Sequence, residues 1–192
     1  IHLTISRYYT PSGRCIQKPF EKDNVDLYHS EEIDRWENGE LYIKDSIKVN
    51  DSLKYTTMNG RTVYGGGGII PDEFVPYDTS MNSSLLFEIL SKDLIRNYVV
   101  KFYTKNNLKG YDYEEAYKSL SKQKIITSFK QFCQRREISW KQKDWNISKK
   151  YIINRLSAYI LRVKFGNNGY YTKTAEIDND IKKALEILSS TY

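Results

Sequence analysis

The chain has 192 residues, which is enough for one domain of ordinary size or slightly more, and 40% of them are hydrophobic. No run of about 18 apolar residues occurs, which excludes a transmembrane helix from this sequence. The two cysteines, Cys15 and Cys133, lie far apart and have no zinc-ligand spacing around them, so we expect two unpaired thiols, no metal site and no cofactor.

Charge is distributed unevenly along the chain. Residues 1–82 hold nine Lys and Arg against 13 Asp and Glu, a net charge of −4, whereas residues 83–192 hold 21 against 11, a net charge of +10. The hydrophobic period also changes near residue 82, from about 2 to about 3.6 residues. We therefore predict an α+β protein with a β-rich segment over 1–82, an acidic surface insertion within it at about 21–52, and a helical domain over 83–192.

The chain opens with strand and turn signals. Apolar residues alternate in residues 1–6, which predicts a strand with one apolar face. In the stretch Thr10-Pro11-Ser12-Gly13, proline stands second and glycine fourth, which is the arrangement of a type I turn.

A β-hairpin is predicted further along. The stretches 55–58 and 61–64 are rich in threonine and tyrosine and flank Asn59-Gly60. Both of these residues tolerate positive φ, which a two-residue type I′ turn demands at its two central positions.

Four consecutive glycines, Gly65, Gly66, Gly67 and Gly68, follow the hairpin. A phosphate-binding loop requires a helix after its glycines, with the N-terminal amides of the helix facing the anion. Here an extended apolar step follows, no Gly-Lys-Ser/Thr occurs, and the GxGxxG pattern fails at Ile70. The run therefore indicates a close backbone approach, or a bulge, at the end of a strand.

Helical periodicity begins at Ser83. Apolar residues recur at helical spacing in 87–102 and in 152–163, and further helices are predicted over 113–120 and 125–133. Asp178 is the predicted N-cap of a last helix. The apolar residues expected on the buried faces of these helices are Phe87, Leu90, Leu94, Tyr98 and Phe102, then Ile152, Leu156, Tyr159, Ile160 and Val163, and finally Ile181, Ala184, Leu185 and Leu188.

No motif of catalytic chemistry is found in the sequence. There is no GxSxG nucleophile elbow, and neither His2 nor His29 lies near a serine or cysteine in a recognisable pattern. Asp178-Asn179-Asp180 lacks the glycine and the glutamate of a calcium loop. The basic helical domain raises the alternative of a module that binds nucleic acid or a protein scaffold. Its lysines are spread over every predicted helix rather than gathered in one stripe, so we expect no nucleic-acid partner.

Two stretches of the chain resemble a known family. They are LTISRYYTPSGRCIQKPF, which begins at Leu3, and GRTVYGGGGIIPDEFVP, which begins at Gly60. Together they are similar to the region after the catalytic lysine in the carboxy-terminal processing, or tail-specific, family of bacterial serine peptidases. The closing stretch from Tyr170 also resembles the end of longer, envelope-associated members. The matching residues are Thr4, Arg7 and Tyr8 on a strand, Thr10, Pro11 and Gly13 in a turn, and Gly68, Ile69, Pro71 and Asp72 after an insertion.

The resemblance implies a serine endopeptidase with a Ser-Lys dyad and a crotonase-like core, which cleaves proteins near their C-termini in the bacterial periplasm. The serine, the lysine, the oxyanion amides and a PDZ domain would precede Ile1, so no residue of this chain is assigned a catalytic role. The chain would supply strands that wall the peptide groove, with Thr4, Ser6 and Arg7 as groove residues. The glycine run would let the backbone pass close beside the core, and Pro71-Asp72 would lock its exit.

Overall fold

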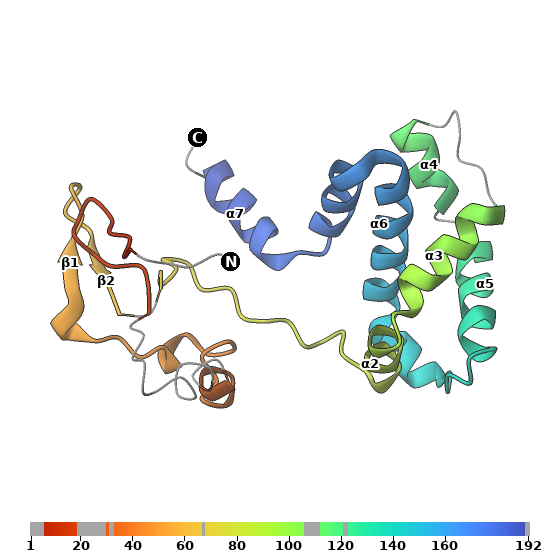
Figure 1. The fold of residues 1–192 in the computed structure, drawn as a ribbon, viewed down its shortest axis with the longest axis horizontal. Helices are drawn as coiled ribbons and strands as arrows, with labels where there is room; N and C mark the ends of the chain where they lie inside the picture. Colours follow the sequence, from red (N-terminus) through yellow and green to blue (C-terminus); the bar gives the residue numbers. More distant parts are fainter. Residues whose placement is uncertain are drawn as a thin grey trace. The chain divides into compact units, whose positions relative to one another are not determined.

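A computed structural model of the chain describes residues 6–18, 30, 33–66, 68–105, 112–120 and 123–190. The chain divides into two compact units, Ile1–Tyr77 and Asp78–Tyr192, and this division lies close to the boundary expected near residue 82. The fold is α+β, because the described residues are mostly helical and include one two-stranded sheet (Figure 1). No helix among them is both long and apolar enough to cross a membrane.

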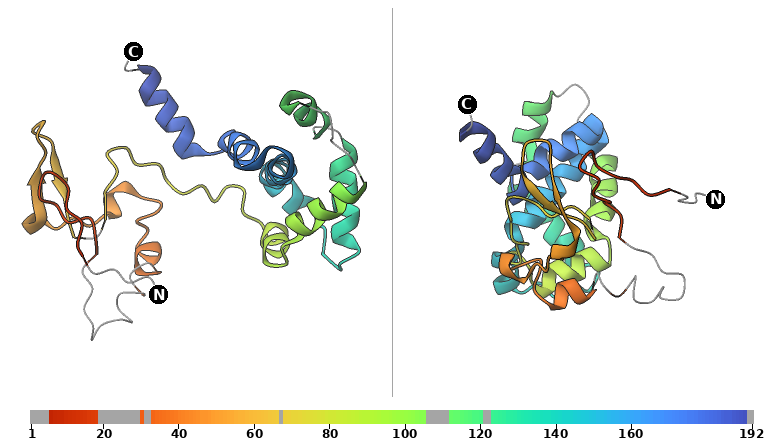
Figure 2. Two further views of the ribbon diagram at one scale, coloured as in Figure 1. Left: turned by 45° about the horizontal axis from the view of Figure 1, so that its top comes forward. Right: turned by 90° about the vertical axis from the view of Figure 1, so that its left-hand side faces the viewer.

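The first unit contains a β-hairpin and short helical turns. Its elements are the 3-10 helices η2 (Lys44–Ser46) and η3 (Asp51–Leu53) and the strands β1 (Lys54–Thr56) and β2 (Thr62–Tyr64), and residues 33–37 are also helical. The two strands pair antiparallel, with Tyr55 opposite Val63. The hairpin therefore forms where the sequence predicts it, and the loop of residues 6–18 lies beside it (Figure 2).

The loop of the hairpin differs from the predicted turn. Thr57 N donates to Arg61 O and Gly60 N donates to Thr57 O, both at 2.9 Å, so the loop has three residues, from Met58 to Gly60. Gly60 alone among them has a positive φ, of 75°, which is the pattern of a type I turn followed by a left-handed glycine. The type I′ prediction is wrong, because the Thr57 hydroxyl accepts a hydrogen bond from Arg61 N at 3.1 Å and holds the longer loop.

The expected turn at residues 10–13 is present. Gly13 N donates to Thr10 O at 2.8 Å, and Gly13 has a φ of 82°. Tyr9 and Cys15, on either side of the turn, form an isolated antiparallel bridge. Of the strand predicted over 1–6, residues 1–5 lie outside the described part of the chain, and Ser6 lies in a bend rather than a strand.

An aromatic cluster packs the end of the first unit against its acidic segment. The rings of Trp36, Tyr42 and Tyr77 have centroids 5.4–6.3 Å apart. Tyr77 N also donates to Leu41 O at 2.8 Å. Residues 33–42 of the segment predicted at 21–52 thus contact the rest of the unit, while residues 21–29 and 31–32 lie outside the described part of the chain.

The second unit is a helical domain built around one long helix. Its helices are α2 (Ser84–Ser91), α3 (Leu94–Lys105), α4 (Tyr113–Leu120), α5 (Gln123–Gln134), α6 (Gln142–Ala175) and α7 (Asn179–Ser190). Within this unit α6 packs against α2, α3 and α4, and α3 also packs against α2 and α5 (Figure 1). The described part of this unit contains one helix more than the sequence predicts, because the stretch 87–102 is divided between α2 and α3.

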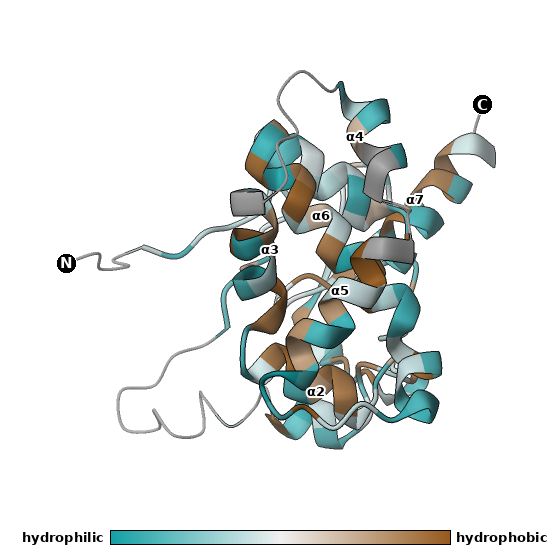
Figure 3. Ribbon diagram, turned by 90° about the vertical axis from the view of Figure 1, so that its right-hand side faces the viewer, coloured by the Kyte–Doolittle hydropathy of each residue, from teal (hydrophilic) through white to brown (hydrophobic). Residues whose placement is uncertain are grey.

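Apolar side chains of α2, α3, α5 and α6 form the main core of this unit. The helices present both hydrophobic and hydrophilic residues, as expected for helices with one buried face (Figure 3). Phe129 is fully buried, and its ring meets that of Tyr98 edge to face at 5.2 Å. The buried members of the core are Leu85, Leu86, Ile89, Leu94, Ile95, Tyr98, Phe129, Phe132, Cys133, Ile138, Ile152 and Leu156.

The buried face of α2 differs from the prediction. Phe87 and Leu90, which the sequence predicts to be buried, are 61% and 46% exposed. The cause is a break before α3, where Asp93 has a positive φ of 50°. The break shifts the helical phase by one residue, so Leu94 and Tyr98 are buried as predicted, whereas the residues before it are not. The residues of α2 that are buried instead are Leu85, Leu86 and Ile89.

The long helix α6 is interrupted at Gly166. This residue has φ 63° and ψ −151°, a backbone conformation that is essentially restricted to glycine, and the chain folds back there. Asn154 Nδ2 donates to Lys173 O at 2.7 Å across the reversal. The two parts are so close at Gly169 that a Cβ on this residue would lie 2.7 Å from Leu161 O.

The last helix begins at its predicted cap but does not bury its apolar face. Ile181 N donates to the Asp178 side chain at 3.1 Å, which confirms Asp178 as the N-cap. Within the second unit α7 lies apart from α2–α5 (Figure 1), and for this reason its predicted burial is wrong. The predicted apolar residues of α7 that are exposed are Ile181, Ala184, Leu185 and Leu188. Val163 on α6, which the sequence also predicts to be buried, is exposed as well.

The phase of α2 can be tested by two neighbouring substitutions. Ile89→Ala should lower the free energy of unfolding by about 2–5 kcal/mol, because Ile89 is 0% exposed and its truncation leaves a cavity in the core. Leu90→Ala is the matched control on the same helix, and we expect it to cost less than about 1 kcal/mol. Thermal and denaturant unfolding of the chain, followed by far-UV circular dichroism, measures both. Equal losses would contradict the observed phase.

Candidate functional site

Parts of the two stretches that resemble the peptidase family meet at the ring of Tyr55. A Cβ built on Gly13 would lie 4.0 Å from this ring, and one built on Gly65 would lie 3.2 Å from it and 3.3 Å from Arg14 Cγ. The side chain of Arg14 is buried, and its Nη1 donates to Tyr64 O at 3.4 Å. The turn and the glycine run, about 50 positions apart in sequence, therefore pack against each other.

The glycine run makes the close approach that the sequence predicts, at two of its positions. Gly65 N donates to Leu53 O at 2.9 Å, which holds the run against the residue before β1. Gly66 has a φ of 94°, and a Cβ there would lie 2.6 Å from Leu53 Cδ1. Gly68 has a φ of 110° but nothing within 4 Å of its Cβ position, so conformation alone requires glycine there. Gly67 lies outside the described residues.

A cavity of about 350 Å³ lies between the turn of residues 10–13 and the loop of the hairpin. Pro11 and Arg14 line it from the turn, and Met58, Arg61 and Val63 line it from the hairpin. The guanidinium of Arg61 also forms an exposed ion pair with Asp72, so the predicted Pro71-Asp72 step is tied to the loop end of the hairpin.

The predicted groove residues do not form a site among themselves in the described part of the chain. Ser6 and Arg7 are exposed, and neither lines the cavity between the turn and the hairpin. Thr4 lies outside the described residues. Their proposed contact with a peptide therefore depends on residues other than those around this cavity.

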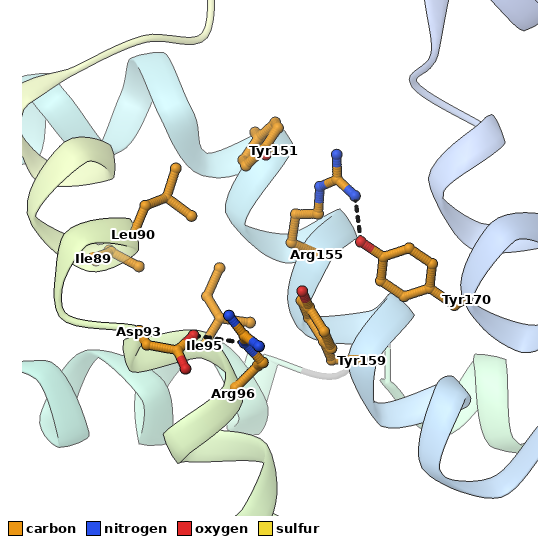
Figure 4. Close-up of a pocket in the computed structure, with 9 residues that line it drawn as sticks. All are labelled: Ile89, Leu90, Asp93, Ile95, Arg96, Tyr151, Arg155, Tyr159 and Tyr170. Atoms are coloured by element: carbon orange, nitrogen blue, oxygen red, sulfur yellow. Dashed lines mark hydrogen bonds and ion pairs between the residues drawn. The ribbon is translucent and has the colours of Figure 1, made fainter. Parts of the chain in front are cut away.

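A second cavity, of about 290 Å³, lies inside the helical unit (Figure 4). It is lined by residues of α2, α3 and both parts of α6, among them Arg96, Arg155, Tyr159 and Tyr170. This site was not predicted from the sequence. A signal for it exists in the four-residue spacing of Tyr151, Arg155 and Tyr159, which places them on one helical face, but Tyr170 joins them only because the chain reverses at Gly166.

The cysteine and two serines of the helical unit that could act as nucleophiles are buried and have structural roles. Cys133 is fully buried, and burial raises its pKa to about 12, so the thiol stays protonated near neutral pH. The hydroxyls of Ser83 and Ser148 lie 2.6 Å apart; Ser83 Oγ accepts from Leu86 N as the N-cap of α2, and Ser148 donates to Met81 O. Within the residues that the structure describes, no three His, Cys, Asp or Glu side chains gather as a metal site would need.

Comparison with known proteins gives a similarity without a function. A family of unknown function (DUF8443) matches residues 85–166, which extend from α2 to the interruption of α6. No curated protein and no solved structure matches the chain significantly. The matched residues include most of the lining of the second cavity and none of the first unit.

The close approach at the glycine run predicts unequal effects of two similar substitutions. Gly66→Ala should reduce local stability by about 1–3 kcal/mol, because the new methyl group combines a strained φ with a contact to Leu53. Gly68→Ala is the control, since it has a positive φ and open space, and we expect a loss of about 1 kcal/mol. Hydrogen exchange of the Gly65 amide reports the difference. Equal protection in both variants would show that the Leu53 contact is unimportant.

The two thiols should differ sharply in reactivity. At neutral pH, iodoacetamide should modify the partly exposed Cys15 in the folded chain and Cys133 only after denaturation, because the thiolate is the reactive form and burial raises the Cys133 pKa to about 12. Mass spectrometry of the Cys15→Ser and Cys133→Ser variants assigns each adduct. Modification of Cys133 in the folded Cys15→Ser chain, as fast as in the denatured chain, would contradict its burial.

Proposed function

We propose that the chain is the C-terminal portion of a bacterial serine endopeptidase of the carboxy-terminal processing, or tail-specific, family, which acts in the periplasm on proteins near their C-termini. The resemblance of residues 3–20 and 60–76 to that family underlies this proposal. The first unit would complete a crotonase-like core, whose nucleophilic serine, base lysine and PDZ domain precede Ile1. The second unit would be a helical C-terminal domain.

The packing of the motif residues supports the proposal. The turn at 10–13, the hairpin and the glycine run all contribute to one cluster around Tyr55 and Arg14. Segments that are distant in sequence but share their contacts are expected when they form one part of a larger domain. The cluster has the hydrogen bonds of β structure without a full sheet, since β1 and β2 are its only strands among the described residues.

The small core of the first unit is the observation that supports the proposal most. In its described part only Arg14 and Val63 are buried. A stable domain of about 60 residues buries about 60% of the surface of its unfolded chain, so we expect other residues to cover this unit. A larger core preceding Ile1 would do so. The large hydrophobic side chains that the unit leaves exposed are Tyr8, Tyr9, Ile33, Trp36, Leu41, Ile43, Val49, Met58, Ile69 and Tyr77.

The chemistry of the proposed enzyme assigns a binding role to this chain. A lysine kept neutral by burial would take the proton of the serine, and the serine oxygen would attack the scissile carbonyl. The peptide C–N bond would then break, with the lysine returning the proton to the leaving amine, and water would hydrolyse the acyl-enzyme to a free carboxylate and the serine. Thr4, Ser6 and Arg7 would contact the peptide in the groove. The exposure of Ser6 and Arg7 leaves their side chains available for such contacts.

Peptide hydrolysis tests the proposal directly. The purified 192-residue chain should cleave no unstructured peptide, because it lacks the proposed serine and lysine. An extended protein, which also includes the residues encoded before Ile1, should cleave such peptides. A truncated protein that ends before Ile1 should be inactive or misfolded. Turnover by the 192-residue chain that disappears on replacing one of its serines or cysteines would overthrow the proposal, as would inactivity of the extended protein.

Two controls separate this function from the alternative of a basic binding module. In the extended protein, Gly66→Ala should lower peptide turnover by disturbing the first unit, whereas Leu90→Ala, on an exposed helical surface, should not.

Binding of the chain to RNA, DNA or a scaffold protein is the competing outcome. An affinity for nucleic acid that falls steeply with added salt would favour the basic module instead.

A further inference from the structure

The cavity of the helical unit joins charged and hydroxyl groups from two distant parts of one helix (Figure 4). Arg155 and Tyr159 belong to the first part of α6, Tyr170 belongs to the part after the reversal at Gly166, and Arg96 comes from α3. In Figure 4 the Arg155 guanidinium points toward Tyr170, with which it forms a hydrogen bond. The cavity therefore has a polar side built from three segments.

Arg155 has a hydrogen-bonding capacity that the protein does not satisfy. Its Nη1 donates to Tyr170 Oη at 2.7 Å, and its guanidinium carbon lies 5.0 Å from the centre of the Tyr151 ring. Its Nε is buried and has no hydrogen-bond partner. Buried N–H groups usually have an acceptor, so the guanidinium keeps a donor that it can offer to a bound ligand or water.

The charge of the lining favours an anion with a single negative charge. Two guanidinium groups, Arg96 and Arg155, and one carboxylate, Asp93, line the cavity, so its net charge is +1. Asp93 Oδ1 accepts from Arg96 Nε at 2.8 Å and neutralises part of that arginine. A carboxylate matches the remaining charge, and its two oxygens suit the planar donors of a guanidinium.

The tyrosines add neutral donors to this charge. Burial raises the pKa of Tyr159 above its ordinary value, so its phenol remains protonated near neutral pH. Tyr170 Oη accepts from Arg155 and keeps its own hydrogen to donate. The rings of Tyr159 and Tyr170 meet edge to face, with centroids 5.1 Å apart, which fixes the positions of both hydroxyls.

The opposite side of the cavity is hydrocarbon. Ile89 and Ile95 line it and are almost completely buried, and Leu90 lies at its edge with 46% of its surface exposed. At about 290 Å³ the cavity is just below the usual range of volumes for small-molecule sites. It therefore suits a small ligand that is partly apolar.

From these features we propose that the cavity binds a small free monocarboxylic acid with a hydrocarbon or aromatic substituent. The carboxylate accepts hydrogen bonds from Arg155 and from the hydroxyls of Tyr159 and Tyr170, and the substituent contacts the exposed part of Leu90. This binding is independent of the peptidase proposed above, because all of its residues belong to the helical unit. It requires no residue upstream of Ile1.

Titration of the full 192-residue chain with benzoate, followed by NMR chemical shifts or calorimetry, tests the site. Benzoate should bind saturably, and benzamide, which has the same shape without the charge, should bind at least about tenfold more weakly. Arg155→Gln should weaken benzoate binding at least about tenfold. Tyr170→Phe removes one hydroxyl and should weaken binding by a smaller factor.

Arg162→Gln is the matched control for Arg155→Gln. Arg162 lies on the same helix and its guanidinium carbon is 5.3 Å from the centre of the Tyr170 ring, but it does not line the cavity. We expect this variant to bind benzoate as the wild type does. A loss of binding equal to that of Arg155→Gln would show that the arginines act only by holding Tyr170 in place, and it would overturn the proposal.

Asp93→Asn removes the negative charge of the ion pair with Arg96 but keeps a side-chain oxygen that can accept from Arg96 Nε. It raises the charge of the lining from +1 to +2, and asparagine tolerates the positive φ of 50° at this position. Benzoate should bind more tightly, and inorganic phosphate should gain more than benzoate does. Weaker binding of benzoate by a folded Asp93→Asn chain, or no saturable binding of benzoate by the wild type, would overturn the proposal.

Discussion

The reversal of the chain at Gly166 is the constraint on which the helical unit and its cavity depend. In an uninterrupted helix Arg155 and Tyr170 would be separated by about 22 Å along the axis, at about 1.5 Å per residue. Instead their polar atoms lie 2.7 Å apart. Few residues other than glycine adopt the φ and ψ of Gly166, and only glycine leaves room for the backbone at Gly169. Gly166 and Gly169 thus allow the large side chains that line the cavity to come together.

Hydrogen bonds across the reversal explain why the second part of α6 stays against the first. Asn154 is buried and donates to Lys173 O, near the end of α6, at 2.7 Å. The side chain of Lys173 is mostly buried and pairs with Glu176 at 2.5 Å. Because a buried polar group without a partner is costly, the Asn154 hydrogen bond to Lys173 O disfavours a straightened helix. The folded-back arrangement in turn keeps Tyr170 beside Arg155.

The sequence predicts those parts of the fold that depend on local signals. The hairpin, the turn at 10–13 and the cap at Asp178 follow from residue types with particular backbone preferences. The exposed apolar residues of α2 and α7 could not be predicted from local signals. The one-residue phase shift at Asp93 and the separation of α7 from its neighbours are tertiary effects. The cavity was beyond the same reasoning, since a helical pattern on either side of Gly166 gives no sign that the two parts meet.

The two units differ in what each needs in order to act. The helical unit has its own core around Phe129, and its cavity is complete within it, so ligand binding is a property of the chain as it stands. The first unit buries only Arg14 and Val63 among its described residues and exposes ten large hydrophobic side chains. Its motifs are well packed around Tyr55, but this cluster is too small to hold a peptide groove in shape by itself. A peptide-binding role for this unit therefore requires the rest of a sheet, which is what the proposed protease core would provide.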